Sequence, residues 1–484
     1  MSNADQNFRE FNYMKNSNFE STLELSHFIR CLFDDSQLSF VLQRMANVLA
    51  LDVGVLNRYF GNSISNAYNH RLGRFGSGLS IWNVFISIGQ VWVWIVAVIL
   101  LSHRERWLGK EMSCQVLIDG IQSKAELERW IALKAALNDD IAFLTKANNI
   151  AVHGFNIIGW KPPFGYKVDR HFLMVCRVCF FSFVPFLILS FRYKINFFNL
   201  LLRAINDFLY YRSVFTKIKS RYLLQDRNLG STNAIRNFLF KCSGGIASCC
   251  VQKNIWQCSG TALYTDVDIL FSIGRRTGEL LSSFDSRVEK VYAVGSMSMQ
   301  NALLGRECAV SEREVLDVLF VGSNTSTDLR RDWSANYEAI NWLVQIANEC
   351  PHLKVGIKHH KNSIPDLNEV KITKGSRVTY IDPDMNTYAQ ALDSRIVVSY
   401  ASTLIYELIG IGKDAYFLDP KGDNTFINPF VSNNYIIEDV KTLNEHLAGD
   451  AKNNARYFAW GQTADYCIPS LDVVRGITAV IRPE

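Results

Sequence analysis

The chain lacks several features that would assign a function at once. Its 484 residues carry a formal net charge of only +5, which is too small to argue for nucleic acid or a membrane as a partner and excludes neither. Its strand–helix turns hold neither the GxxxxGK[ST] motif of ATPases nor the GxGxxG motif of dinucleotide-dependent dehydrogenases. The sequence also has no internal repeat and no low-complexity segment. None of these common nucleotide-binding classes therefore gains support.

A secretory signal and a paired cysteine motif are also missing. The first residues, MSNADQNFREFNYMKN, are polar and contain no apolar signal segment. We therefore expect the eleven cysteines to be reduced thiols of a cytoplasmic protein. Cys176 and Cys179 form a CxxC inside an apolar run, and Cys249 and Cys250 are adjacent in a strand-like run. Because no second CxxC accompanies either pair, the sequence predicts no zinc site.

Two long apolar stretches, residues 79–101 and 172–191, are each long enough to cross a bilayer core of ~30 Å. Ten Lys or Arg lie between them in residues 103–171, and the segment after the second stretch is basic as well. Two spans would place the first basic segment outside, against the positive-inside tendency. We expect helices that rest on the cytoplasmic face of the bacterial inner membrane. True spans and buried core helices are the alternatives.

The chain divides into regions that differ in their pattern of apolar residues. Residues 1–219 are expected to be mostly helical, with a helix over 123–147 that begins with a Ser123 cap. Residues 220–300 alternate strands with helices as the remainder of a first Rossmann-like domain, and residues 315–440 form a second one. A polar connector is expected over 295–315 and helices over 441–484. The fold class is α/β, with two facing Rossmann-like domains and a ligand between them.

The segment VVSYASTLIYELIGIGKDAYFLDP, residues 397–420, predicts a strand, a turn, a helix and a strand. We expect Ser402 or Thr403 to cap the helix and, together with Ser399, to donate hydrogen bonds to a phosphate at the helix amino end. Glu407 would then accept hydrogen bonds from ribose hydroxyls. The alternative is an ordinary Ser or Thr cap with a solvent-facing Glu407.

Basic and imidazole side chains gather at the end of the strand in LKVGIKHHKN, at Lys358, His359, His360 and Lys361. Such a group indicates an anion site, for which we prefer phosphate to metal because no third metal ligand lies nearby. The strand in LFVGSN ends in Gly322 and Ser323, where the glycine would allow backbone to approach a ligand closely.

The segments LFVGSN, LKVGIKHH, TYIDPD and VVSYASTLIYELIGIGKDAYFLDP, in this order, resemble the second domain of GT-B glycosyltransferases. The most similar group makes bacterial surface polysaccharides: capsule Kdo-transferase-like and polysialyltransferase-like enzymes, related to CDP-glycerol glycerophosphotransferases. Those enzymes have His-Pro after the second strand and Ser-Ser or Ser-Thr before a helix bearing Glu. Here Ser402-Thr403 and Glu407 match, and His359 or His360 matches the histidine, but no proline follows. The resemblance covers residues 220–440.

The resemblance implies a metal-independent glycosyltransferase without a cofactor, which moves a sugar from a nucleotide-activated donor to a surface glycan or lipid-linked acceptor. The donor would be a CMP-sugar such as CMP-Kdo. The nucleotide would be bound by Gly322, Ser323, His360, Ser399, Ser402, Thr403 and Glu407. His359 would balance charge on the leaving phosphate, and Asp226 would act as the base or, alternatively, as a carboxylate nucleophile.

Other assignments remain open at this stage. Asp266, Asp268 and His153 are alternative bases, and Asp226 itself is alternatively a turn or capping residue. Polyol-phosphate transfer from CDP-glycerol and a non-catalytic, membrane-attached assembly protein are alternative functions. Nucleic-acid binding is not expected, because the chain shows no basic aromatic face.

Overall fold

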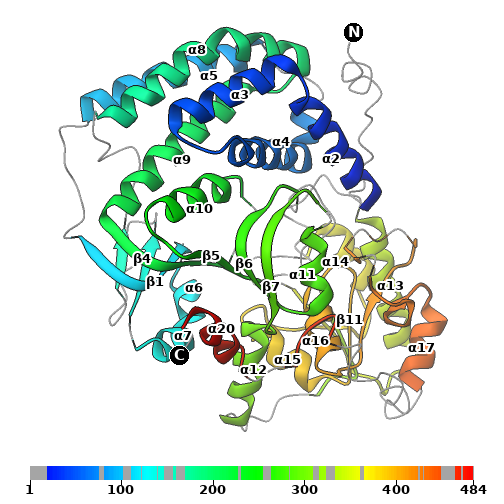
Figure 1. Ribbon diagram of the computed structural model, residues 1–484. Helices are drawn as coiled ribbons and strands as arrows, with labels where there is room; N and C mark the ends of the chain where they lie inside the picture. The colour runs from blue at the N-terminus through cyan, green and yellow to red at the C-terminus, as the bar shows by residue number, and fades with distance from the viewer. Residues whose placement is uncertain are drawn as a thin grey trace.

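The computed structural model describes residues 19–75, 81–101, 111–121, 123–138, 140–145, 156–159, 169–226, 230–253, 263–282, 284–308, 315–322, 333–359, 365–422, 424, 426–428, 430–448, 464–469 and 472–482. Two parallel sheets, a helical layer above the first sheet and a returning C-terminal helix make up these residues (Figure 1).

The first sheet has seven strands in the order β3-β2-β1-β4-β5-β6-β7, all paired in parallel. Its strands are β1 Met112–Ile121, β2 Ile141–Thr145, β3 Ile157–Gly159, β4 Ile218–Gln225, β5 Ala247–Val251, β6 Asp266–Ser272 and β7 Arg287–Ala293. Helices α10 Thr232–Cys242 and α11 Arg275–Ser282 follow β4 and β6. The strands expected between residues 220 and 300 are confirmed.

The first domain begins before residue 220, since β1, β2 and β3 lie within the segment that we expected to be mostly helical. The single helix expected over 123–147 is wrong. This segment instead contains two short helices, α6 Lys124–Glu128 and α7 Ile131–Ala136, followed by strand β2. The Ser123 cap is confirmed, since its Oγ accepts a hydrogen bond from the Glu126 N–H at 3.3 Å.

The second sheet has six strands in the order β10-β9-β8-β11-β12-β13, again parallel. They are β8 Val318–Val321, β9 Val355–Lys358, β10 Thr379–Tyr380, β11 Ile396–Ser399, β12 Ala415–Leu418 and β13 Ile436–Ile437. Their helices are α13 Ser334–Glu349, α14 Leu367–Thr373, α15 Thr387–Asp393, α16 Leu404–Gly410 and α17 Val440–Ala448. This order confirms the predicted second Rossmann-like domain.

Two segments join the domains. The segment expected to be a polar connector consists mostly of helix α12 Met297–Cys308, which packs against α15 of the second domain. The C-terminal helix α20 Val473–Ile481 returns to the first domain, where its apolar residues join the core formed with α6, α7 and the first sheet. On the way, the Ile468 N–H donates to the Ile273 carbonyl at 2.9 Å. Tyr466 also packs against Tyr406 of the second domain. Residues 464–468 therefore contact both domains.

The helical layer consists of α2 Phe19–Phe33, α3 Ser36–Leu49, α4 Val53–Phe75, α5 Ile81–Leu101, α8 Arg170–Tyr193 and α9 Phe197–Lys217. It lies above the first sheet, with α9 and α10 between the sheet and the outer helices (Figure 1). One hydrophobic core runs from these helices into the sheet. Two windows, Asn83–Leu100 and Arg170–Tyr193, are long and apolar enough to cross a membrane, and only 28% and 39% of them is buried.

Candidate functional site

Asp226 lies directly after β4, at the carboxyl edge of the first sheet. Its carboxylate forms an ion pair with the Arg129 guanidinium, and the two side chains are 9% and 18% exposed. The Lys253 ammonium, which follows β5, lies 4.0 Å from the same carboxylate. Three charged side chains thus meet at the edge where ligands bind in open α/β sheets.

Glu407 of the second domain lies near these charged side chains, since the charge of Arg129 acts on it. It lies in α16 with 1% of its surface exposed, and its Oε1 accepts a hydrogen bond from the Tyr388 hydroxyl at 3.1 Å. Burial raises the pKa of Glu407 to about 7, although Ser296, Tyr388 and the charge of Arg129 favour the ionised form. Among the described residues, Oε2 has no hydrogen bond of normal geometry. We expected a Glu407 open to a ribose and found a buried carboxyl.

Arg129 lies between Asp226 of the first domain and Glu407 of the second. We call this place, where the two domains meet, the junction. Arg129 pairs with Asp226 in the first domain, and its charge also acts on Glu407 and Tyr388 in the second domain. Sequence reasoning missed Arg129, because it ends a short helix in a region without a recognisable motif. Tyr388 and Ser296 were also missed, because neither belongs to a motif that points to a site. The junction therefore contains two carboxyl groups with one guanidinium near both of them.

The hydroxyls of the β11–α16 turn are used differently from our expectation. The Ser399 Oγ is fully buried, donates to the Val321 carbonyl at 2.6 Å and accepts from the Ser402 N–H at 2.9 Å. It is therefore used within the fold and is not free for a nucleotide. The Ser402 Oγ accepts a hydrogen bond from the Leu404 N–H, the first of α16, at 3.3 Å, although Thr403 is the residue directly before the helix. Thr403 makes no side-chain cap bond.

His359 is buried and fixed directly after β9. Its Nε2 lies 2.6 Å from Glu369 Oε1, which also accepts from the Tyr380 hydroxyl at 3.0 Å. An ionised carboxylate only accepts, so Nε2 carries a proton. Among the described residues, no hydrogen bond reaches His359 Nδ1, which becomes a donor when the ring is protonated. A Cβ added to Gly322 would lie 2.5 Å from this Nδ1, so Gly322 makes room for the imidazole ring.

Lys358 is buried beneath this site. Its ammonium donates to the Pro383 carbonyl at 2.7 Å, which holds the loop after β10. Burial lowers the pKa of Lys358, although the carboxylates of Asp382 and Asp384 act in the opposite direction. Lys358 is therefore a structural cation. His360, Ser323, Lys361 and His153 lie outside the described residues, which contain no group of three or more potential metal ligands.

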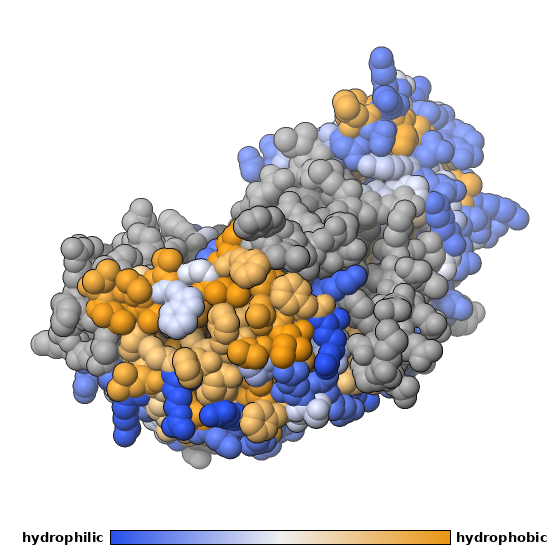
Figure 2. All heavy atoms as spheres, turned by 90° about the horizontal axis from the view of Figure 1, so that it is seen from above, coloured by the Kyte–Doolittle hydropathy of each residue, from blue (hydrophilic) through white to orange (hydrophobic). Residues whose placement is uncertain are grey.

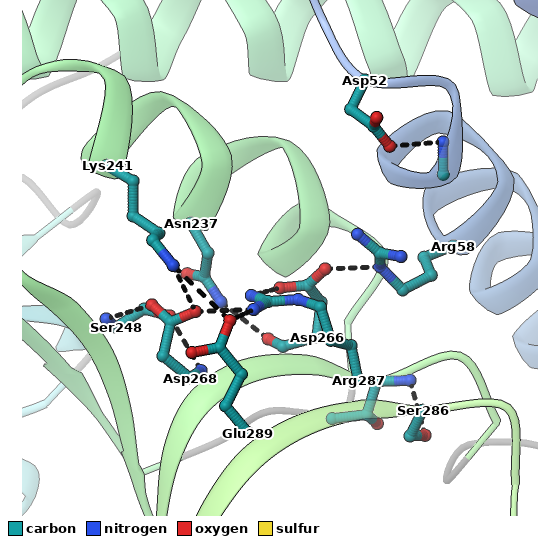
Figure 3. A network of polar contacts seen from close by, with 12 residues as sticks. Asp52, Arg58, Asn237, Lys241, Ser248, Asp266, Asp268, Ser286, Arg287 and Glu289 are labelled. Atoms are coloured by element: carbon teal, nitrogen blue, oxygen red, sulfur yellow. Dashed lines mark hydrogen bonds and ion pairs between the residues drawn. The ribbon is translucent and has the colours of Figure 1, made fainter.

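Asp266 and Asp268 belong to a different site. They lie at the amino end of β6, opposite the edge that carries Asp226, in a network that ties α4 and α10 to the sheet (Figure 3). Arg287 pairs with Asp266 at 2.5 Å and with Asp268 at 2.7 Å, and Arg58 also pairs with Asp266 at 2.5 Å. Burial acts to raise the pKa of Asp268, but the Ser248 N–H and Arg287 lower it overall. These two aspartates are structural, and neither faces the second domain as a base would.

No protein-family model and no curated protein matches the sequence. Among solved structures, UDP-N-acetylglucosamine 2-epimerase from Listeria monocytogenes is similar with a TM-score of 0.47 and 10% identity, covering 77% of this chain and 96% of its own. The epimerase from Neisseria meningitidis bound to UDP-GlcNAc gives 0.46 and 11%, covering 76% and 100%. The wall teichoic acid polymerase TagF gives 0.45 and 8%, covering 83% and 97%.

These TM-scores and identities are too low to assign a function, so the fold rests on the strand orders. Both sheets are parallel, helices cover them, and α12 and the returning C-terminal segment connect them. The chain has the two-domain architecture of the GT-B fold, with a helical N-terminal region added to it.

Proposed function

We propose that this chain is a glycosyltransferase that moves a sugar from a nucleotide-activated donor to the hydroxyl of a glycan or lipid-linked acceptor. The observation that carries the proposal is the junction where Asp226 and Arg129 of one domain meet Glu407 and Tyr388 of the other. Two carboxyl groups that share one cation at the carboxyl edge of a sheet, one of them with a pKa raised by burial, make this junction a candidate active site.

The roles follow from the charges. An acceptor hydroxyl attacks the sugar carbon, the bond from that carbon to the phosphate oxygen breaks, and the nucleotide leaves with the bonding electrons. Asp226 is our proposed base for the hydroxyl proton, and taking it up requires its ion pair with Arg129 to loosen. The freed guanidinium then offsets the charge on the leaving phosphate, an interaction that is strongest in the transition state. Arg129 thus couples proton uptake by Asp226 to the departure of the nucleotide.

The second domain supplies the nucleotide side. His359 presents Nδ1, held in orientation by Glu369, and a protonated imidazole there donates to a phosphate oxygen. The Glu407 carboxyl, whose pKa is raised to about 7 by burial, can either donate or accept a hydrogen bond near neutral pH. Following the motif resemblance, the proposed donor is a CMP-sugar. CDP-glycerol is the alternative that a donor screen must separate.

Transfer assays with Asp226→Asn test the proposal. The matched control is Asp285→Asn, because Asp285 also pairs with an arginine, Arg30, but far from the junction. We expect Asp226→Asn to lower kcat by roughly 10²–10⁴-fold, as loss of a general base does, without weakening nucleotide binding, because Arg129 is then free to meet the phosphate. Equal activity of the two variants would remove Asp226 from the mechanism. A wild-type protein that binds nucleotide but transfers neither a sugar nor glycerol phosphate would instead support the non-catalytic alternative.

A further inference from the structure

Helices α5 and α8 lie side by side on the outside of the helical layer (Figure 1). Seen from above, apolar residues gather over this part of the molecule (Figure 2). The exposed members are Phe85, Ile86, Trp92, Val93, Val96, Ile99 and Leu100 on α5 and Leu173, Phe180, Val184, Ile188 and Phe191 on α8. We call these residues the α5–α8 face. Soluble monomers rarely leave an apolar patch of this kind uncovered.

Both helices also bury a second stripe within the protein. In α5 the buried residues Val84, Val91, Ile95 and Val98 follow helical spacing. In α8 the buried residues include Phe172, Val175, Phe186 and Leu189. Each helix therefore has one side in the protein core and the other side outside, and neither is a buried core helix with apolar residues left over by chance. What covers the outer side must lie along both helices at once.

The charges on α8 indicate what that covering is. Arg177 is exposed within the apolar row, between Leu173 and Phe180. Arg170 and Arg192 are exposed near the ends of the helix, where Asp169 caps α8 and Asp35 pairs with Arg192 at 2.9 Å. Neither α5 nor α8 itself contains an Asp or Glu. An apolar face whose middle carries the cation Arg177 and no anion fits an acyl layer beneath anionic headgroups. A second copy of this chain would bring the same cations against themselves.

Arg177 also decides the orientation. It lies seven residues after the start of α8 at Arg170, or about 10 Å along the axis at ~1.5 Å per residue. If α8 crossed the bilayer, Arg177 would lie inside the ~30 Å apolar core, where a cation is costly. If α8 lies flat, the guanidinium reaches headgroup phosphates while its neighbours enter the acyl region. The buried stripe on the opposite side leaves only this orientation.

We propose that the α5–α8 face binds the surface of an anionic lipid bilayer, with both helices parallel to the membrane plane. The inference rests on the helical layer alone and does not depend on the proposed transfer reaction. It also gives a lipid-linked acceptor a place close to the protein.

The experiment is flotation of the whole chain with preformed vesicles of phosphatidylcholine alone or with phosphatidylglycerol. The test variant is Val184→Glu and its control is Val315→Glu, because both valines are 60% exposed and only the first lies on the face. We expect the anionic vesicles to bind the wild type, Val184→Glu to weaken partitioning by roughly tenfold, and Val315→Glu to have no effect. Arg177→Gln should weaken binding to the anionic vesicles by roughly fivefold and leave the phosphatidylcholine vesicles unaffected.

A fluorophore at position 180, read with lipids quenched at known depths, tests the orientation. A flat helix places it about 5–10 Å below the headgroups. A label at the bilayer centre would overturn the flat orientation. Failure to float with either vesicle, or equal effects of the two valine variants, would overturn the proposal. A dimer in light scattering that Val184→Glu dissociates would assign the face to a second copy instead.

Discussion

Replacing Glu407 by Gln should remove a specific part of the pH dependence of stability. The carboxyl is 1% exposed, and its burial raises the pKa to about 7 from the ordinary value of 4.5. The native state therefore holds this proton more tightly than the unfolded chain does. Stability is full below pH 4.5 and falls as the pH rises towards 7, because ionising the buried carboxyl costs free energy that ionisation in water does not.

The size of the loss follows from the shift. A change from 4.5 to about 7 corresponds to about 3 kcal/mol at ~1.4 kcal/mol per pKa unit. Gln keeps the shape and cannot ionise, so the variant lacks this loss. At roughly 2–4 °C per kcal/mol for a domain of this size, the wild type should lose about 6–12 °C of Tm between pH 4.5 and 7.5 beyond what the variant loses.

The assay is thermal unfolding of both proteins across this pH range, followed by circular dichroism. The difference between the two curves isolates Glu407, because every other titrating group is common to both. Curves that stay parallel from pH 4.5 to 7.5 would refute the reasoning, since the carboxyl would then be ionised at no cost. A difference that grows towards low pH would mean that the shift has the opposite sign.

Two further predictions concern the joints of the fold. Gly274→Ala places a Cβ 2.3 Å from the Tyr466 carbonyl oxygen, so it should displace the returning C-terminal segment and cost about 1–3 kcal/mol. Gly305→Ala in α12 meets nothing within 4 Å and should raise the Tm, and a lower Tm for Gly305→Ala than for Gly274→Ala would contradict the packing described. Arg236→Met leaves the buried Asp119 without its guanidinium partner at 2.9 Å and should cost about 3–5 kcal/mol. An unchanged Tm in that variant would show that the pair is not buried as described.

The second domain was predictable because its strands are apolar runs separated by turns and helices of ordinary length. The first half was harder. Strand β2, Ile141–Thr145, is a run of five buried residues that follows two short helices. A short apolar run of this kind has the same pattern in a helix and in a buried strand. Only its parallel pairing with β1 and β3 distinguishes the two.

Helix α12 was missed for a related reason. Its sequence, MSMQNALLGREC, mixes polar and apolar residues without a clear apolar stripe and so indicated a connector, although most of these residues favour a helix and only Gly305 is a poor helix former. Its contacts with α15 and α20 are made by segments far away in the sequence. The same holds for the site. Motif spacing singled out Glu407 and His359 as candidates, but nothing local reveals that the Ser399 hydroxyl meets the Val321 carbonyl or that Arg129 meets Asp226.

The most direct test of the account is calorimetric titration of the full chain with CMP, CDP and UDP. If the junction binds the phosphate of an activated donor, at least one of these nucleotides binds. Arg129→Met and His359→Ala should then each weaken its Kd by roughly tenfold or more, which corresponds to loss of one charged hydrogen bond. Arg30→Met, which breaks an ion pair outside the junction, should bind as the wild type does. A chain that binds none of the three nucleotides, or variants at the junction that bind as tightly as the Arg30 control, would contradict the account.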